Sequence, residues 1–188
     1  MPVFKDRSAL ESRPASILVP MPIAIQGVDP TQNEFLASLE AKSKQPNAFF
    51  RAMAHRPEVL KSFVPLYGAI MGKGSVEQRV KELVYLTCSY ANQCAFCTAA
   101  HAASAPKAGV TDAEMRALQA GDEKPFSAPE RVAIAYARDL TRTATAGESR
   151  EALFAHFTQE QIVEITLVAA LANFTNRFNN GLQILPEA

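Results

Sequence analysis

Residues 82–101 read ELVYLTCSYANQCAFCTAAH, and this stretch holds all three cysteines and one of the three histidines of the chain. Cys94 and Cys97 are separated by two residues, and His101 follows four residues later. On a helix these three side chains project from one face. Two thiols at this spacing close a disulfide with little backbone movement, and a thiol near a helix N-terminus has a lowered pKa. The stretch therefore favours thiol redox chemistry.

The segment before the cysteine pair is predicted to be a helix that folds back against the next one. Apolar residues at helix-like spacing predict an amphipathic helix over about 75–90. Asn92 is the expected N-cap of a second helix, with Cys94 in its first turn. In one straight helix Glu82 would lie about 28 Å from His101, at about 1.5 Å per residue. A bend near Asn92 instead brings the two residues level, so we expect a helical hairpin that gathers a carboxylate, an imidazole and two thiols.

The spacing of these residues resembles a known motif. Glu82 is followed after eleven residues by Cys94-x-x-Cys97, and after three more by His101. This pattern resembles the core motif of the alkyl hydroperoxidase D (AhpD) family, within the wider carboxymuconolactone decarboxylase superfamily. The likeness covers roughly residues 45–182. It extends to these further residues: Ser89, Asn92, Asn173, Asn176 and Arg177.

The resemblance implies an all-helical, cofactor-free thiol peroxidase that reduces organic hydroperoxides, or passes electrons to a peroxidase. In that role Cys97 would be the peroxidatic thiol that becomes a sulfenic acid, and Cys94 would resolve it as a disulfide and act in proton transfer. Glu82 and His101, joined through a water, would form the proton relay. The sequence departs from the family at Phe96, where well-known members carry a second histidine. This departure implies a shorter relay, a more apolar pocket and a peroxidase activity that is weaker or redirected.

The resemblance also implies partners. The substrate would be an organic hydroperoxide, and an external dithiol, suggested to be of the lipoyl type, would restore the cysteine pair. The superfamily resemblance suggests a homo-oligomer. The last predicted helix is apolar nearly all round over 163–174, a pattern typical of a helix buried in a core or in a subunit interface.

The composition limits the classes of partner. The chain of 188 residues is 48% hydrophobic, which fits one compact domain. Lys plus Arg and Asp plus Glu both number 19, so no global field attracts nucleic acid or an anionic membrane. The apolar stretches are too short and interrupted to span a bilayer, and the N-terminus lacks a secretory signal. Three cysteines in such a chain point to a reducing compartment, and we expect a cytoplasmic protein.

Outside the motif the chain is predicted to be helical. Residues 1–29 contain four prolines among apolar residues and are interpreted as an N-terminal arm laid over its own domain or over a neighbouring subunit. Residues 30–188 are predicted to form one all-α domain. Capping boxes at 111–114, 127–130 and 158–161 mark three helix starts. The expected helices cover 30–44, 48–55, 57–71 with an interruption at Pro65, 75–90, 92–105, 111–121, 127–143, a short segment ending near 157, and 158–179.

Two other classes of function stay open at this level. The three cysteines together with His101 would make a zinc ligand set, in a structural or partner-binding helical module. On one helix, however, Cys88 points about 120° away from Cys94. The second alternative is a carboxymuconolactone decarboxylase-type enzyme, whose chemistry needs no thiols.

Overall fold

The computed structural model describes residues 25–186, and every regular element within them is a helix. The predicted all-α class is confirmed. Most of the predicted arm 1–29 lies outside the described residues. The helices are α1 (Glu34–Ser43), α2 (Ala48–Met53), α3 (Pro57–Met71), α4 (Gln78–Ala91), α5 (Ala95–Ser104), α6 (Asp112–Ala120), α7 (Ala128–Thr143), α8 (Gly147–Leu153) and α9 (Gln159–Leu182), with 3-10 turns at Pro30–Gln32 and Ala105–Ala108.

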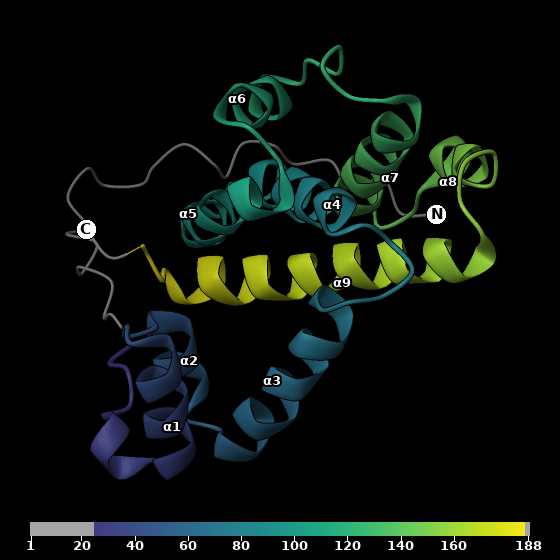
Figure 1. Cartoon of the computed structure of the whole chain (residues 1–188). Helices are drawn as coiled ribbons and strands as arrows, with labels where there is room; N and C mark the ends of the chain where they lie inside the picture. Colours follow the sequence, from purple (N-terminus) through teal and green to yellow (C-terminus); the bar gives the residue numbers. More distant parts are fainter. Residues whose placement is uncertain (1–24, 187–188) are drawn as a thin grey trace, which may run out of the picture.

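The long helix α9 separates two groups of helices (Figure 1). In this view α4, α5, α6 and α7 lie on one side of α9, and α1, α2 and α3 lie on the other. Because α4 contacts α5, α6, α7 and α9, residues 80–89 of α4 are all buried. The predicted amphipathic pattern is therefore wrong for the middle of this helix, whose polar side chains face neighbouring elements. No helix of the described part of the chain is both long enough and apolar enough to cross a membrane.

Local capping sets three helix starts where they were predicted. Thr111, Ser127 and Thr158 are the N-caps of α6, α7 and α9. Each forms a capping box with the side chain three positions later, so that both partners satisfy a backbone N–H of the first turn. These three predictions are confirmed.

The first predicted helix, over 30–44, is divided in two. Asp29 accepts a hydrogen bond from the Thr31 backbone N–H and caps the turn Pro30–Gln32. Asn33 then accepts from the Leu36 backbone N–H and caps α1. Two capping side chains so close together end one element and begin another.

Two further boundaries differ from the predictions. Pro65 does not interrupt α3, because Pro65 and Lys61 both lie on its exposed side, where solvent can satisfy the carbonyl that a proline leaves unbonded. Helix α9 continues to Leu182, past the predicted end at 179. It ends where Gln183 adopts a left-handed φ of 55°.

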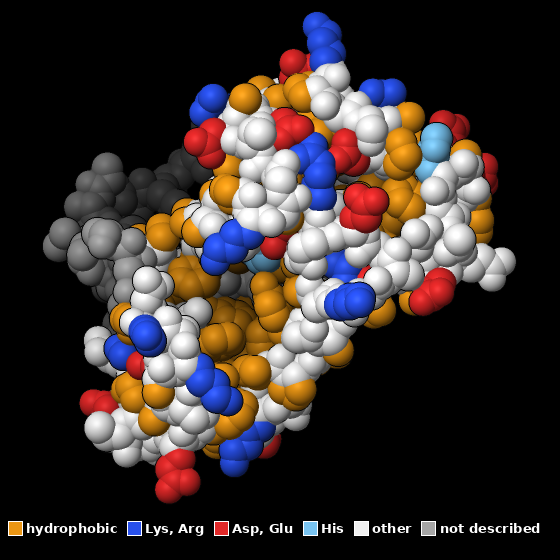
Figure 2. Space-filling view, in the orientation of Figure 1, with side chains coloured by type: hydrophobic (Ala, Val, Ile, Leu, Met, Phe, Trp, Pro, Cys, Tyr) orange, Lys and Arg blue, Asp and Glu red, His pale blue; other side chains and the backbone are white. Residues whose placement is uncertain are grey.

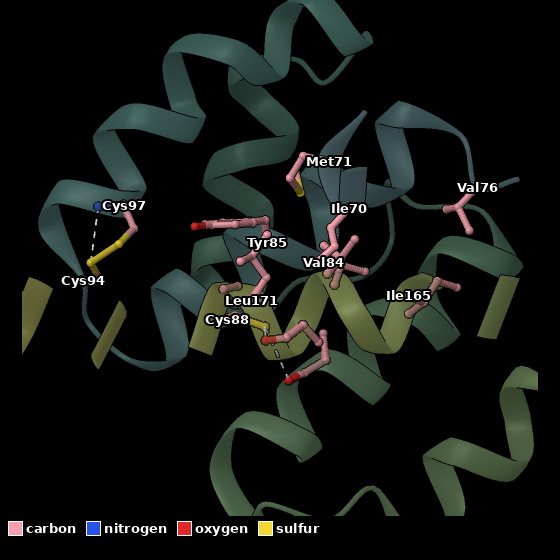
Figure 3. Packing of buried hydrophobic residues seen from close by; sticks show 14 of the residues in the cluster. Ile70, Met71, Val76, Val84, Tyr85, Cys88, Cys94, Cys97, Ile165 and Leu171 are labelled. Atoms are coloured by element: carbon pink, nitrogen blue, oxygen red, sulfur yellow. Dashed lines mark hydrogen bonds between the residues drawn. A yellow bond between two sulfur atoms is a disulfide. The ribbon is translucent and has the colours of Figure 1, made fainter. Parts of the chain in front are cut away.

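The main core forms where α4 meets α9 (Figure 3). Val84, Tyr85 and Cys88 of α4 belong to the same buried cluster as Ile165 and Leu171 of α9. Full burial of each large apolar side chain contributes about 1.5–3 kcal/mol. This packing holds α4 against α9 and so positions the polar side chains that the two helices carry beyond the core.

Candidate active site

The turn between α4 and α5 brings the motif residues together. Helix α4 ends at Ala91, and Gln93 then adopts a left-handed φ of 54° that changes the direction of the chain. Cys94 is the N-cap of α5, and its Sγ accepts a hydrogen bond from the backbone N–H of Cys97 at 3.3 Å. The predicted hairpin is confirmed. Asn92, however, is the C-cap of α4 and not the N-cap of α5, because the reversal follows it.

Asparagine side chains of α9 hold this turn in place. Asn92 Nδ2 donates to Oδ1 of Asn173 and of Asn176, both at 2.9 Å. Asn180 Nδ2 donates to the backbone oxygen of Asn92 at 2.8 Å. Arg177 in turn donates to Asn173 Oδ1 at 2.5 Å. The late residues that the resemblance grouped with the motif therefore connect the turn to α9.

Cys94 and Cys97 are joined by a disulfide at the start of α5 (Figure 3). Their Cα atoms are 5.4 Å apart, and the two residues are 0% and 3% exposed. Asn179 Nδ2 donates to Cys97 Sγ at 3.2 Å. When the pair is reduced, the N–H groups of the first helical turn favour the thiolate form.

Glu82 and His101 form a buried pair across the hairpin. His101 Nδ1 lies 2.8 Å from Glu82 Oε2, and the two side chains are 7% and 6% exposed. Ser104 Oγ donates to the other carboxylate oxygen at 3.1 Å. The contact is direct, so the expectation of a water between the two side chains is wrong. The carboxylate orients the imidazole so that Nε2 faces away from Glu82.

Two tyrosines flank His101. The ring of Tyr85 stacks on the imidazole, with centroids 3.5 Å apart and planes inclined by 19°. The Tyr67 hydroxyl lies 3.3 Å from His101 Nε2, and burial, followed by the nearby Glu82 charge, raises the pKa of Tyr67 to about 12. Burial also raises the pKa of Tyr85, whose hydroxyl lies 2.5 Å from Thr175 Oγ1. Both phenols therefore stay protonated near neutral pH.

The sequence interpretation did not include these tyrosines or Asn179. Tyr85 follows Glu82 by three residues on α4, so helical spacing offered a signal that both side chains share a face. Tyr67 comes from α3 and Asn179 from α9. Both residues lie far from the cysteine pair in the sequence, so the local spacing of residues does not predict that they meet it.

Cys97, His101 and Asn179 line one cavity of about 150 Å³. Figure 2 shows hydrophobic side chains around a hollow between the α1–α2 end of the molecule and the side that carries α5. Phe96, at the position where family members have a second histidine, is part of the cavity lining. A disulfide sulfur, an imidazole and an amide are thus grouped within a mostly aromatic lining.

The third cysteine lies elsewhere. Cys88 Sγ is 3.9 Å from the carbonyl oxygens of Ala137 and Ala169, and burial raises the pKa of this thiol to about 12. Within residues 25–186, no group of three or more His, Cys, Asp and Glu side chains is placed to hold a metal ion. The zinc ligand set considered from the sequence is therefore not assembled.

Comparison with known families confirms the resemblance seen in the motif. Residues 57–139 match the Carboxymuconolactone decarboxylase family. This segment runs from α3 into α7 and includes all of 82–101.

Solved structures share the AhpD-like fold. An uncharacterized peroxidase-related protein from Silicibacter sp. TM1040 is 22% identical, with a TM-score of 0.74 over 87% of this chain and 88% of that one. A protein of unknown function from Agrobacterium tumefaciens, proposed to be an antioxidant defence protein AhpD, is 27% identical, with a TM-score of 0.67 over 72% and 95%. The debrominase Bmp8, in complex with 2,3,4-tribromopyrrole, is 20% identical, with a TM-score of 0.73 over 93% and 94%. The predicted fold is therefore confirmed.

Proposed function

We propose that this protein, whose residues 57–139 match the carboxymuconolactone decarboxylase family, is a thiol peroxidase that reduces organic hydroperoxides. One observation carries the proposal. Cys97, which is joined to Cys94, lines one cavity with His101, whose Nδ1 is held by Glu82. A redox-active thiol beside an oriented base is the arrangement that peroxide reduction requires.

The first half of the reaction oxidises Cys97. In the reduced protein His101 accepts the thiol proton, and the Glu82 carboxylate, 2.8 Å from Nδ1, stabilises the imidazolium. The thiolate attacks the terminal oxygen of R–O–O–H, the O–O bond breaks, and Cys97 becomes a sulfenic acid while R–O⁻ departs. The alkoxide regains the proton from His101 through the Tyr67 hydroxyl, 3.3 Å from Nε2, and leaves as the alcohol.

The second half closes and reopens the disulfide. The Cys94 thiol condenses with the Cys97 sulfenic acid and releases water. An external dithiol then attacks the disulfide, supplies two electrons and leaves in its own disulfide form. Because Cys94 is 0% exposed and Cys97 3%, the attack falls on Cys97 through the cavity. A slender dithiol of the lipoyl type suits such access better than a bulky protein thiol.

Intact-protein mass spectrometry after one equivalent of an organic hydroperoxide tests this function. We expect wild type to lose two hydrogens as the disulfide forms. Cys94→Ser should gain one oxygen, because the sulfenic acid of Cys97 has no resolving thiol. Cys97→Ser should not react.

A matched control is Cys88→Ala, which removes the remaining thiol outside the cavity. This variant should behave as wild type. Unchanged peroxide turnover in Cys97→Ser would refute the assignment of the peroxidatic thiol. If both cysteines can be replaced by serine without loss of activity on a lactone acid, a decarboxylase reaction is the better description.

Reductive debromination of an aromatic ring is a second candidate. The aromatic lining formed by Phe49, Phe63 and Phe96 favours it, and a debrominase shares the fold. The two thiols would supply two electrons, so that Ar–Br gives Ar–H, bromide, a proton and the disulfide. Release of bromide from a bromopyrrole, faster than reduction of any organic hydroperoxide, would favour this reaction.

We also propose that the protein is a cytoplasmic homo-oligomer. Val163, Leu167 and Phe174 of α9 are 59%, 45% and 48% exposed, and an exposed apolar row of this kind suits a subunit contact. A reducing compartment would keep the dithiol donor available. A monomer in sedimentation equilibrium, at concentrations where the protein is active, would contradict the oligomer.

A further inference from the structure

Asn179, a residue of the cavity wall, carries a hydrogen-bond acceptor that no group in residues 25–186 satisfies. Asn179 is 1% exposed, and its Oδ1 is the one buried side-chain nitrogen or oxygen of the described chain without a hydrogen-bond partner. Buried polar atoms are nearly always paired, because an unpaired one has lost its bond to water without replacement. The unpaired oxygen therefore marks a position where a bound molecule can supply a donor.

Cys97 holds the Asn179 amide in this orientation. Nδ2 donates to Sγ at 3.2 Å. The flipped amide would place its oxygen against a disulfide sulfur, which has no proton to donate. The other hydroxyl groups of the cavity wall, on Tyr67, Tyr85 and Thr175, each have a partner elsewhere. Oδ1 thus stays available to a ligand.

The rest of the cavity selects an apolar ligand of limited size. Aromatic rings form much of the wall and favour contact with another ring. Four of them belong to Phe49, Phe50, Phe63 and Phe96. The volume of about 150 Å³ is similar to that of an engineered enclosed cavity known to hold benzene, and this cavity is also open to solvent on one side. A molecule with one ring and a single O–H donor at one end fits these walls and the unpaired acceptor.

We propose that Asn179 Oδ1 accepts the O–H of a compact one-ring hydroperoxide and so presents its terminal oxygen to Cys97, an inference that rests on the proposed peroxidase function. The oxygen that carries the hydrogen is the oxygen that the thiolate attacks. Because Oδ1 and Nδ2 belong to one planar amide, a peroxide bound at Oδ1 lies beside the sulfur that Nδ2 contacts. Asn179 is a substrate-binding residue, and the preferred substrates are small aryl hydroperoxides such as benzyl hydroperoxide.

Binding of two redox-inert probes to the disulfide form tests the inference without any turnover. In 2-phenylethanol a CH2 group replaces the inner peroxide oxygen of benzyl hydroperoxide, and the terminal hydroxyl is kept. Propylbenzene replaces that hydroxyl with a methyl group. We expect wild type to prefer the alcohol. In Asn179→Leu, the ratio of the two Kd values, measured by NMR titration, should shift by about tenfold toward the hydrocarbon, as expected for one hydrogen bond.

The ratio of the two Kd values distinguishes the loss of one hydrogen bond from a general disturbance of the fold. A purely structural role of Asn179 would weaken both probes together, whereas loss of an acceptor weakens the alcohol and strengthens propylbenzene. Asn179→Ala also lacks the acceptor and should show the same change of preference, which covers the case in which the leucine variant does not fold. An unchanged ratio in a folded variant overturns the inference.

Kinetics distinguish this inference from the proposed function. In Asn179→Leu, kcat/KM for benzyl hydroperoxide should fall at least tenfold. If wild type reduces benzyl hydroperoxide and the variant matches it, the inference fails and the proposed function stands. If wild type reduces no hydroperoxide, the proposed function fails, and the assignment of a peroxide as ligand fails with it.

Discussion

Lys81 and Glu82 are consecutive residues of α4, both almost completely buried, yet they form two different kinds of buried pair. The ammonium group of Lys81 donates to the carbonyl oxygens of Ile70 at 2.9 Å and of Gly72 at 2.7 Å, and also contacts the Glu164 carboxylate. An ammonium group has three N–H donors, and three partners surround this one.

Glu164 is equally engaged. Its other carboxylate oxygen accepts from the backbone N–H and the hydroxyl of Ser75, at 2.8 and 2.7 Å. Both members of the Lys81–Glu164 pair therefore have further hydrogen-bond partners, and we call such a pair closed. It connects the loop after α3 to α9.

The Glu82–His101 pair is open, because the carboxylate contacts only one of the two ring nitrogens. Glu82 occupies one ring nitrogen of His101, and the other faces the Tyr67 hydroxyl at the cavity wall. A closed buried pair holds two segments together, because breaking it leaves charges unpaired. An open pair leaves one nitrogen able to exchange a proton with a bound molecule.

The largest expected effect comes from breaking the closed pair. Lys81→Met leaves Glu164 and two carbonyl oxygens without their donor, so the free energy of unfolding should fall by about 3 kcal/mol. Urea denaturation measures the loss. The rate of peroxide reduction per folded molecule should stay within about twofold of wild type, because Lys81 and the groups it contacts lie outside the cavity. The exposed Lys61→Met is the control and should change stability by less than about 0.5 kcal/mol.

Glu82→Gln tests the open pair. The amide keeps the shape of the side chain but removes the charge that stabilises imidazolium, so peroxide reduction should slow by about 100-fold, or about 2.7 kcal/mol in activation free energy. Stopped-flow measurement of Cys97 oxidation checks this. If oxidation proceeds at the wild-type rate, the pair has no part in proton transfer.

Gly74→Ala is expected to disturb the closed pair by steric means. A Cβ at this position would lie 1.9 Å from Glu164 Oε1, which contacts Lys81, while Ser75 holds the other oxygen of the same carboxylate. The loss of stability should be about 2 kcal/mol. Gly68→Ala is the matched control, since no atom lies within 4 Å of its Cβ. Equal thermal unfolding of the two variants would contradict the expected role of Glu164.

Tyr67→Phe should have a smaller effect on the open pair. The change removes the hydroxyl 3.3 Å from His101 Nε2 and keeps the ring in the cavity wall. Loss of one hydrogen-bonded step should reduce the peroxidase rate about tenfold, with little change in the free energy of unfolding. A wild-type rate in this variant would mean that His101 exchanges its proton with the ligand directly.

The smallest expected effect is the loss of stability that acid causes by protonating Glu164 in the closed pair. Burial raises the pKa of Glu164, but the hydrogen bonds from Lys81 and Ser75 outweigh it and lower the pKa from 4.5 to about 2. The unfolded chain therefore binds a proton first, so the stabilisation is present above pH 4.5 and is lost as the pH falls toward 2. Between about pH 5 and about pH 3.7, wild type should lose about 1 kcal/mol more than Glu164→Gln in urea denaturation. Parallel losses would show that Glu164 is not responsible.

The sequence by itself determined the helical class, several helix starts and the identity of the motif residues. The capping boxes at Thr111, Ser127 and Thr158 close within one turn, so their geometry needs no distant partner. The spacing of the motif likewise identified Glu82 and His101 as residues that meet once the chain bends. Local interactions, and a motif contained in two adjacent helices, are visible in the order of the residues.

Only the tertiary structure decided which other groups complete the cavity. Tyr67 reaches His101 from α3, and Asn179 reaches Cys97 from α9. The sequence also could not distinguish Lys81 from an ordinary solvated charge, although it is 1% exposed and paired with Glu164. These contacts join segments far apart in the chain, and their geometry depends on how whole helices pack. No local spacing of residues specifies that packing.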